Sequence, residues 1–141
     1  MKKNVYVLGN PLVDIDNLPI KLLPKLQKHF PGFSFIHFDP TEELPVNNKE
    51  LIFIDTVLGL KKVTRFNGLN HWTISPRVGV HDFDLPINLH LMQKLGKIKK
   101  VVIIGIPEKG NQQRILAQVS HYLRIYNGGK RGKIIKYTQL T

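Results

Sequence analysis

Four short apolar runs constrain the fold of this chain more than any other feature of its sequence. They are Val5–Leu8, Phe33–Phe38, Leu51–Ile54 and Val101–Ile106. Each run ends at turn-forming or polar residues, and three of them are continuous rather than alternating in hydrophobicity. Continuous runs are typical of strands that are covered on both faces, as in a parallel sheet. The runs therefore predict a sheet that is buried between two layers.

Helical patterns lie between these runs. Apolar residues recur at helical spacing in Leu18–Phe30, Leu85–Leu95 and Gln112–Tyr126. Asn111 is the expected N-cap of the last helix, and Gly96 is the expected end of the second. Pro24 predicts a late start or a bend in the first helix. Strands that alternate with helices predict a three-layer αβα domain, of the α/β class, around a mostly parallel twisted sheet.

Two stretches fall outside this alternation. Residues 61–74 contain Val63, Arg65 and Trp72–Ile74 around Asn67-Gly68, and they could give one or two edge strands, including an antiparallel one. The tail, residues 130–141, is expected either as a final strand or as loose chain. No repeat or low-complexity tract marks a boundary, so we expect a single domain over residues 1–141.

The composition excludes several kinds of site. The 141 residues include no cysteine, which excludes disulfides, thiolate metal sites, iron–sulfur clusters and cysteine nucleophiles. No apolar run approaches the ~20 residues of a membrane span, and no secretory signal is visible, so the cytoplasm is the expected location. The formal net charge of +11 attracts polyanions, and nucleic acid, anionic lipid and an acidic protein surface all fit it.

Polar residues follow the expected strands at their carboxyl ends, where open parallel sheets bind ligands. Asp14 and Asp16 follow the first strand, and Asp55 ends the third. His81 precedes the helix that leads to the fourth. Two carboxylates and an imidazole that converge there would suit a divalent ion such as zinc or nickel, with positions left open for a substrate group or water.

Each of these residues also has a structural explanation. Asp16 could cap the following helix, Asp55 could accept backbone N–H bonds at the strand end, and His81 could be a surface or capping residue. Asp82 and Asp84 are better explained as acids at a helix start. The remaining histidines lack acidic partners at metal-site spacing and are expected to be structural or exposed. The residues alone leave both explanations open.

Four segments, taken together, resemble the hydrogenase maturation endopeptidases. Val7–Asp16 resembles their first strand with its Gly-Asn turn and acidic pair, and Leu51–Val57 resembles their third strand, which ends in Asp. His81–Gly96 resembles their histidine segment and its helix, and Val102–Glu108 resembles their late strand and its exit. The four segments occur in the family's order and span about residues 5–125. The family's fold, a twisted sheet between helix layers, agrees with the fold expected above.

The resemblance implies a metal-dependent, aspartic-type endopeptidase. Its substrate would be the nickel–iron hydrogenase large-subunit precursor, which loses a C-terminal extension once nickel has been inserted. Asp16, Asp55 and His81 match the metal-binding positions and would be catalytic through the ion. That ion is nickel carried by the substrate, for which zinc or cadmium can substitute. The loop that receives the tail would be shaped by Gly9, Asn10 and Gly79.

The chain departs from the family's pattern at three places. Ile15 stands where the first acid of the pair is usual, and Asn17-Leu18-Pro19 replaces the glycines that usually follow. The segment between Asp39 and Leu51 is short for a second helix. Because all three metal positions keep side chains that can bind a metal, we expect an active enzyme. Its acidic loop would bind nickel more weakly or serve a divergent substrate.

Two alternatives remain at this point. Gly9-Asn10-Pro11 after a strand also resembles the start of the peptidyl-tRNA hydrolases, and the basic charge suits a nucleic-acid substrate, although no segment matches that family's catalytic histidine. The other alternative is a basic binding module without catalysis. Its charge would come from Lys61-Lys62, Lys97-Lys99-Lys100 and Lys130-Arg131-Lys133.

Overall fold

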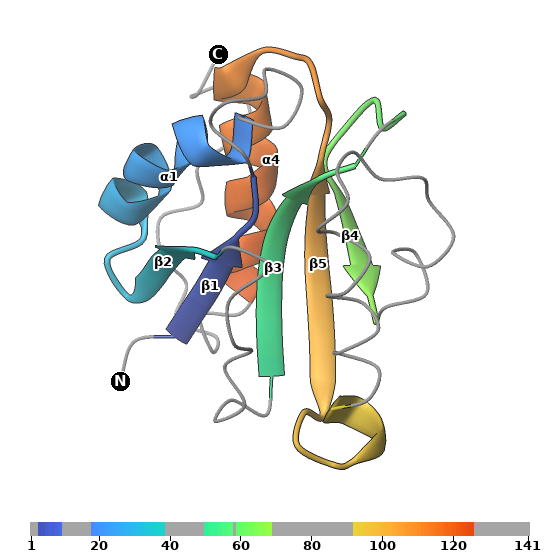
Figure 1. Ribbon diagram of the computed structural model, residues 1–141. Coiled ribbons are helices and arrows are strands. Elements are labelled where there is room, and N and C mark those ends of the chain that lie inside the picture. The colour runs from blue at the N-terminus through green and yellow to red at the C-terminus, as the bar shows by residue number, and fades with distance from the viewer. Residues whose placement is uncertain (1–2, 10–17, 39–49, 58, 69–91, 126–141) are drawn as a thin grey trace.

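The computed structural model describes residues 3–9, 18–38, 50–57, 59–68 and 92–125, and the structural statements below concern these residues. They form a five-stranded sheet in the order β2-β1-β3-β5-β4 (Figure 1). The strands are β1 (Lys3–Val7), β2 (Phe33–His37), β3 (Glu50–Thr56), β4 (Thr64–Asn67) and β5 (Lys100–Ile106). Strands β2, β1, β3 and β5 are parallel, and β4 pairs antiparallel with β5. The predicted mostly parallel sheet with an antiparallel edge strand is confirmed.

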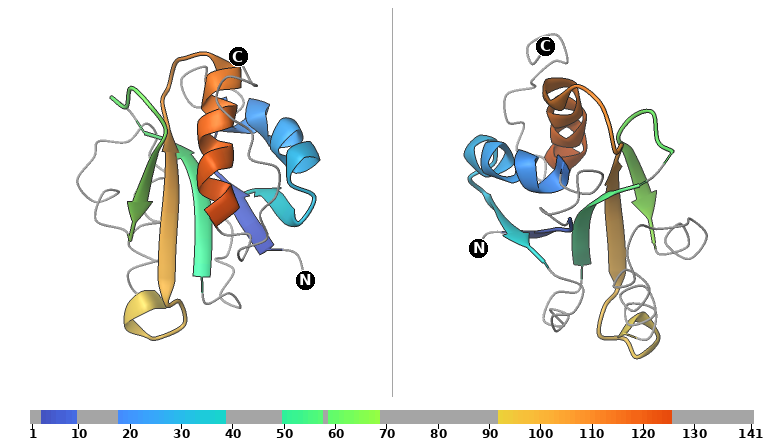
Figure 2. Two further views of the ribbon diagram at one scale, coloured as in Figure 1. Left: turned by 180° about the vertical axis from the view of Figure 1, so that it is seen from behind. Right: turned by 45° about the horizontal axis from the view of Figure 1, so that its top comes forward.

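Two helices, α1 (Leu18–His29) and α4 (Gln112–Ile125), lie side by side on one face of the sheet (Figure 2). Leu22 and Leu26 of α1 and Val119 and Leu123 of α4 are fully buried against the strands. We call this packing the helix-face cluster. The strands contribute to it Val5, Val7, Ile52, Ile54, Ile104 and Ile106.

The other face of the sheet is built from the alternate residues of the same strands. Tyr6, Leu51, Phe53 and Ile103 are buried there in a second cluster, in which the rings of Tyr6 and Phe53 lie 5.8 Å apart. Burial on both faces explains why the runs are continuous in the sequence. Residues 92–94, which are helical, belong to the predicted Leu85–Leu95 helix, and Met92 packs against this second cluster. The rest of that helix lies outside the described residues, as do residues 39–49 and the tail.

The predicted caps occur where the sequence places them. Asn111 Oδ1 accepts a hydrogen bond from the Arg114 N–H at 3.0 Å, which makes Asn111 the N-cap of α4. Gly96 has a φ of 74°, and its N–H donates to the Gln93 carbonyl at 3.0 Å. The Lys97 N–H donates to the Met92 carbonyl at 2.9 Å, which completes a Schellman closure of the helix end.

Of the two alternatives predicted at Pro24, a late start or a bend in the first helix, the structure excludes the late start, and the bend stays a prediction. Helix α1 begins at Leu18 and contains Pro24 in its interior. Pro24 has no N–H to donate to the Ile20 carbonyl, and this loss destabilises a helix interior. Leu22 and Leu26 are fully buried on either side of Pro24, so tertiary packing outweighs the missing bond.

Gln27 closes the outer edge of β2. Its side-chain amide donates to the Phe33 carbonyl at 2.9 Å, and its oxygen accepts from the Phe35 N–H at 3.1 Å. These backbone groups face away from β1, so the amide takes the place of a neighbouring strand and blunts an open sheet edge.

None of the described helices combines the length and the apolar character needed to span a bilayer.

Candidate functional site

The chain adds strands to opposite sides of β1, so the order of the strands in the sheet reverses between β1 and β3. Strand β1 leads through α1 to β2 on one side, whereas β3 and β5 extend the sheet on the other. In open parallel sheets, ligands bind outside the carboxyl ends of the strands at such a point. We call this end the carboxyl edge, and it is the upper end of the sheet in Figure 1. The polar residues that we place there are Asp55, Thr56 and Glu108.

Asp55 lies at the carboxyl edge with a buried side chain, which is 3% exposed. Its position pairs with Gly105 of β5. On the other side the Leu8 N–H donates to the Ile54 carbonyl at 2.8 Å, which ties the exit of β1 to β3. Because side chains alternate along a strand, Asp55 points to the face of Phe53, opposite α1 and α4. Asp55 therefore combines a buried carboxyl group with a place at the end of the sheet where open parallel sheets bind ligands.

The absence of a side chain at Gly105 allows neighbouring segments to pack closely on the Asp55 side of the sheet. A Cβ atom at Gly105 would come within 2.8 Å of Val57 Cγ2 and 2.9 Å of Phe66 Cε2. It would also come within 3.2 Å of Leu60 Cδ1. The loop after β3 and the edge strand β4 therefore approach the Asp55 side of the sheet only because residue 105 lacks a side chain.

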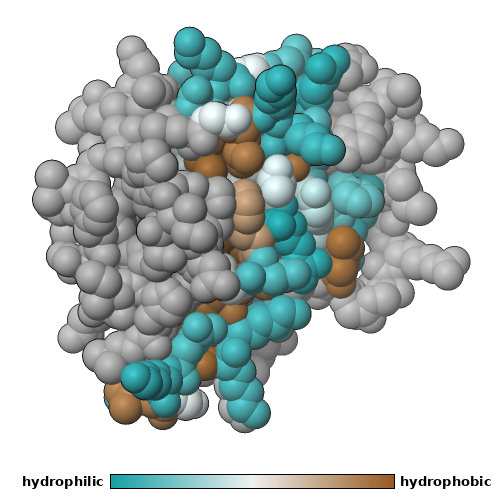
Figure 3. Space-filling model, turned by 90° about the vertical axis from the view of Figure 1, so that its right-hand side faces the viewer, coloured by the Kyte–Doolittle hydropathy of each residue, from teal (hydrophilic) through white to brown (hydrophobic). Residues whose placement is uncertain are grey.

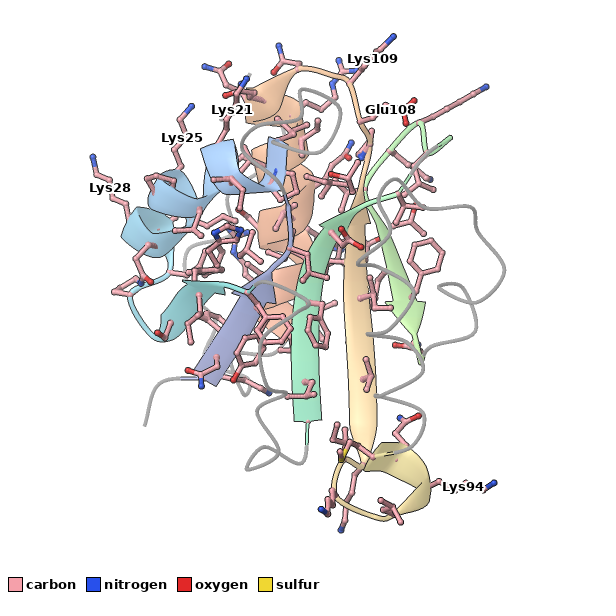
Figure 4. The ribbon with its side chains drawn as sticks, in the orientation of Figure 1. Lys21, Lys25, Lys28, Lys94, Glu108 and Lys109 are labelled. Carbon is pink, nitrogen blue, oxygen red and sulfur yellow. The ribbon has the colours of Figure 1, made fainter. Side chains whose placement is uncertain are left out.

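Two polar groups at the carboxyl edge were not among the predicted site residues. Thr56 Oγ1 and Glu108 Oε2 are buried atoms with no hydrogen-bond partner in the described part of the chain. Glu108 follows the end of β5, as Figure 4 shows. The sequence carries a signal for Glu108, because, like Asp55, it is an acid at the carboxyl end of a continuous apolar run. Pro107-Glu108 equally suits an ordinary turn, so the sequence signal does not single out Glu108.

Gly9 is the predicted tail-loop residue that the structure describes. Its carbonyl lies 2.9 Å from His37 Nε2, so the ends of β1 and β2 are joined at the carboxyl edge. A carbonyl only accepts hydrogen bonds, so Nε2 must carry the proton in this contact. His37 is exposed, in agreement with the structural or exposed role predicted for it.

The remaining predicted site residues, Asn10, Asp16, Gly79 and His81, lie outside the described residues, as do Asp14, Asp82 and Asp84. The structure thus places Asp55 and Gly9 at one edge of the sheet, and the convergence of Asp16, Asp55 and His81 stays a prediction. Within the described ranges no group of three or more His, Cys, Asp or Glu side chains could hold a metal ion.

Hydrophilic residues gather at the carboxyl edge. Figure 3 views the molecule from the side of β4, and hydrophilic residues cover the upper end of the described surface. Lys61 and Lys62 follow β3 and Lys109 follows β5, and all three are exposed. Exposed lysines therefore follow the carboxyl ends of β3, on which Asp55 lies, and of β5.

Solved structures of hydrogenase maturation enzymes share this fold. The hydrogenase maturating endopeptidase HybD from E. coli superposes with a TM-score of 0.67 at 16% identity, over 90% of this chain and 94% of that one. The [NiFe] hydrogenase maturation protease HybD from Thermococcus kodakarensis gives a TM-score of 0.60 at 21% identity, over 89% and 97% of the two chains. A solution structure of an Escherichia coli endopeptidase gives 0.60 at 16% identity, over 90% and 94%.

No family model matches the sequence, and no curated protein sequence matches it. The likeness to the solved structures therefore concerns the fold, and it extends over nearly the whole chain.

Proposed function

We propose that this chain is a cytoplasmic endopeptidase that removes the C-terminal extension of a nickel–iron hydrogenase large-subunit precursor after nickel insertion. The main observation in support of this proposal is the buried position of Asp55 in the sheet. A carboxyl group that is 3% exposed stands at the switch point of a sheet whose fold is shared with hydrogenase maturation endopeptidases. No feature of the described residues favours a peptidyl-tRNA hydrolase over this activity.

The proposed mechanism is recognition of the nickel ion that belongs to the substrate. Asp16, Asp55 and His81 would fill coordination positions that the precursor leaves open on its nickel, with zinc or cadmium as substitutes. An ion is the largest local charge in such a site, so a precursor without it would bind poorly. Cleavage is then gated by the substrate, which makes the enzyme metal-dependent although the ion is not its own.

The surroundings of Asp55 suit this role. The side chain is buried, and attraction between charges is stronger where water is excluded. The charge of the substrate's nickel would polarise the scissile carbonyl or an attacking water. The aspartates act through the ion in this proposal, and no residue of the chain is assigned as a nucleophile.

The test is processing of a purified precursor with and without nickel. We expect the purified chain to shorten the nickel-loaded precursor at its C-terminus, as measured by intact mass, and to leave the nickel-free precursor unchanged. Equal cleavage of both forms would contradict the gating mechanism. No cleavage of either form would contradict the proposed function.

A second measurement tests the metal site itself. Titration calorimetry with nickel, zinc or cadmium should show weak binding, because the physiological ion arrives with the substrate. Binding should weaken as the pH falls through the ordinary imidazole pKa of ~6.5, because a protonated imidazole cannot bind a metal. His81→Ala should lose this binding, whereas His121→Ala, a change on the exposed side of α4, should keep it. Identical titrations of wild type and His81→Ala would remove His81 from the site.

A further inference from the structure

Helix α1 carries a row of lysines along one side. Lys21, Lys25 and Lys28 are spaced four and three residues apart, a spacing that places side chains on the same side of a helix. All three are exposed, and their side chains project outward from the helix in Figure 4. We call these three residues the α1 lysine row.

The row is uncompensated within the part of the chain that the structure describes. Residues 18–38 contain no aspartate or glutamate, and none of the three lysines forms an ion pair with a described residue. Like charges at this spacing oppose helix formation rather than support it. Lys28 lies in the last turn, where a cation interacts favourably with the helix dipole, whereas Lys21 and Lys25 have neither that position nor an ion pair with a described residue.

The row begins at the carboxyl edge. Helix α1 starts two residues after Asp16, and Lys21 lies at the end of α1 nearest the carboxyl edge. Lys25 and Lys28 continue the row away from that edge (Figure 4). A partner seated on the row would have its near end beside the candidate site and its bulk beyond the helix.

A second basic group lies at the opposite end of the sheet and serves as a comparison. Lys97, Lys99 and Lys100 are exposed at the amino end of β5, and we call them the far-end lysines. Lys94, from the same segment, marks that end in Figure 4. The sequence does not distinguish these two groups of three lysines, whereas the fold places only the first beside the carboxyl edge.

We propose that the α1 lysine row is the docking surface for an acidic patch on the folded body of the protein substrate. This inference rests on the proposed function, because a substrate that presents its tail to Asp55 must place its body outside the carboxyl edge. Complementary charge at the rim of an interface raises the association rate and orients the partner. The row thus aligns the precursor before the nickel and the tail engage.

The chemistry of the row favours a protein over a nucleic acid. A protein that makes about six to ten phosphate contacts binds nucleic acid with a steep salt dependence, whereas the row by itself offers three charges. Helix α1 also contains no Phe, Tyr or Trp on which a base could stack.

The experiment compares two charge-reversal variants with equal change in net charge. Lys21→Glu/Lys25→Glu/Lys28→Glu and Lys97→Glu/Lys99→Glu/Lys100→Glu each lower the formal net charge from +11 to +5. Processing of nickel-loaded precursor is measured over a range of precursor concentrations and ionic strengths. Circular dichroism and thermal unfolding confirm that both variants fold, and Lys21→Arg/Lys25→Arg/Lys28→Arg retains the charge of the row.

We expect reversal of the α1 lysine row to lower kcat/KM about tenfold at low ionic strength, at the lower end of the range for electrostatic steering. The kcat at saturating precursor should be unchanged, because the row does not touch the scissile bond. The effect should shrink as the Debye length falls to ~8 Å at physiological salt. The arginine variant and the far-end variant should both resemble wild type.

If the wild-type protein processes the precursor, three outcomes would contradict the proposed docking surface. The row variant could keep the wild-type kcat/KM, or both reversal variants could lose kcat/KM equally, which would indicate steering by total charge. Alternatively, the row variant could process precursor normally but lose tight binding of a single-stranded polyuridine oligonucleotide, which would assign the row to nucleic acid. A wild-type protein that leaves nickel-loaded precursor intact overturns the proposed function, and the docking surface with it.

Discussion

The two ends of strand β3 carry the same kind of side chain in opposite environments. Glu50, at the amino end, is 31% exposed and lies 3.7 Å from the Lys3 ammonium, whose side chain is 38% exposed. Asp55, at the carboxyl end, is 3% exposed on the face of Phe53. Glu50 is half-buried, with Oε1 buried and without a hydrogen-bond partner among the described residues, and a partly exposed ion pair of this kind stabilises little. Asp55 stands at the switch point of the sheet and Glu50 at the opposite end, so the comparison assigns the surface role to Glu50 and the functional role to Asp55.

The largest expected effect is on processing by Asp55→Asn compared with Glu50→Gln. Each change replaces a carboxylate by an amide of the same shape on the same strand. We expect Asp55→Asn to lower the rate of precursor processing by about 10²-fold or more, as when one group that stabilises a transition state is removed. Glu50→Gln should process nickel-loaded precursor at the wild-type rate, as measured by intact mass at several time points.

Thermal unfolding of both proteins is the control, because loss of activity through unfolding would carry no information about the site. A folded Asp55→Asn protein with normal processing would break the comparison, since the two ends of β3 would then be functionally equivalent.

The next effect concerns packing at the same two ends of the sheet. Gly105 pairs with Asp55, and an added Cβ there would collide with Val57 and Phe66, at 2.8 and 2.9 Å. We expect Gly105→Ala to lower the free energy of unfolding by about 1–3 kcal/mol, the usual cost of overpacking. Gly32 precedes β2 at the amino end, and a Cβ there would meet nothing within 4 Å. Gly32→Ala should therefore change stability by less than about 1 kcal/mol and could be stabilising.

Urea unfolding of both glycine variants measures this difference. Equal free energies of unfolding for Gly105→Ala and Gly32→Ala would show that the carboxyl edge is no more tightly packed than the amino end. Processing by Gly105→Ala is a useful second readout, because the shifted neighbours lie beside Asp55.

The smallest effect is expected from the ion pair itself. Glu50→Gln removes the attraction to Lys3, and exposed pairs of this kind contribute about 0–1 kcal/mol. The destabilisation should diminish as salt is added, because salt screens exposed charges. Unfolding of Glu50→Gln in low and high salt is the measurement. A salt-independent loss well above that range would mean that Glu50 does more than form a surface pair.

Much of the fold could be predicted from local signals. The four apolar runs, three of them continuous, became β1, β2, β3 and β5, and Asn111 and Gly96 cap helices as their residue types suggest. These signals are local, because a strand buried on both faces and a helix end each leave a pattern within a few residues. Pro24 left a late start and a bend open, and the late start did not occur because the burial of Leu22 and Leu26 outweighs the local preference of proline.

The candidate site was only partly predictable. Asp55 was found because it is an acid at the end of an apolar run, and Gly9 because it follows another. Glu108 has the same signal, but Pro107-Glu108 is also typical of a turn, so the sequence alone does not distinguish a site residue there. The contact between His37 and Gly9 joins residues 28 positions apart, and nothing near either residue indicates it.

The sequence by itself determined the class of the fold, the ends of its helices and the strand on which the central acid lies. Only the tertiary structure decided that Asp55 is buried beside Gly105, that His37 reaches Gly9, and that one of two lysine groups borders the carboxyl edge. The physical reason is that hydrophobic periodicity and capping act between near neighbours in the chain. Burial, close approach and the placement of charge depend instead on the order in which distant strands pair.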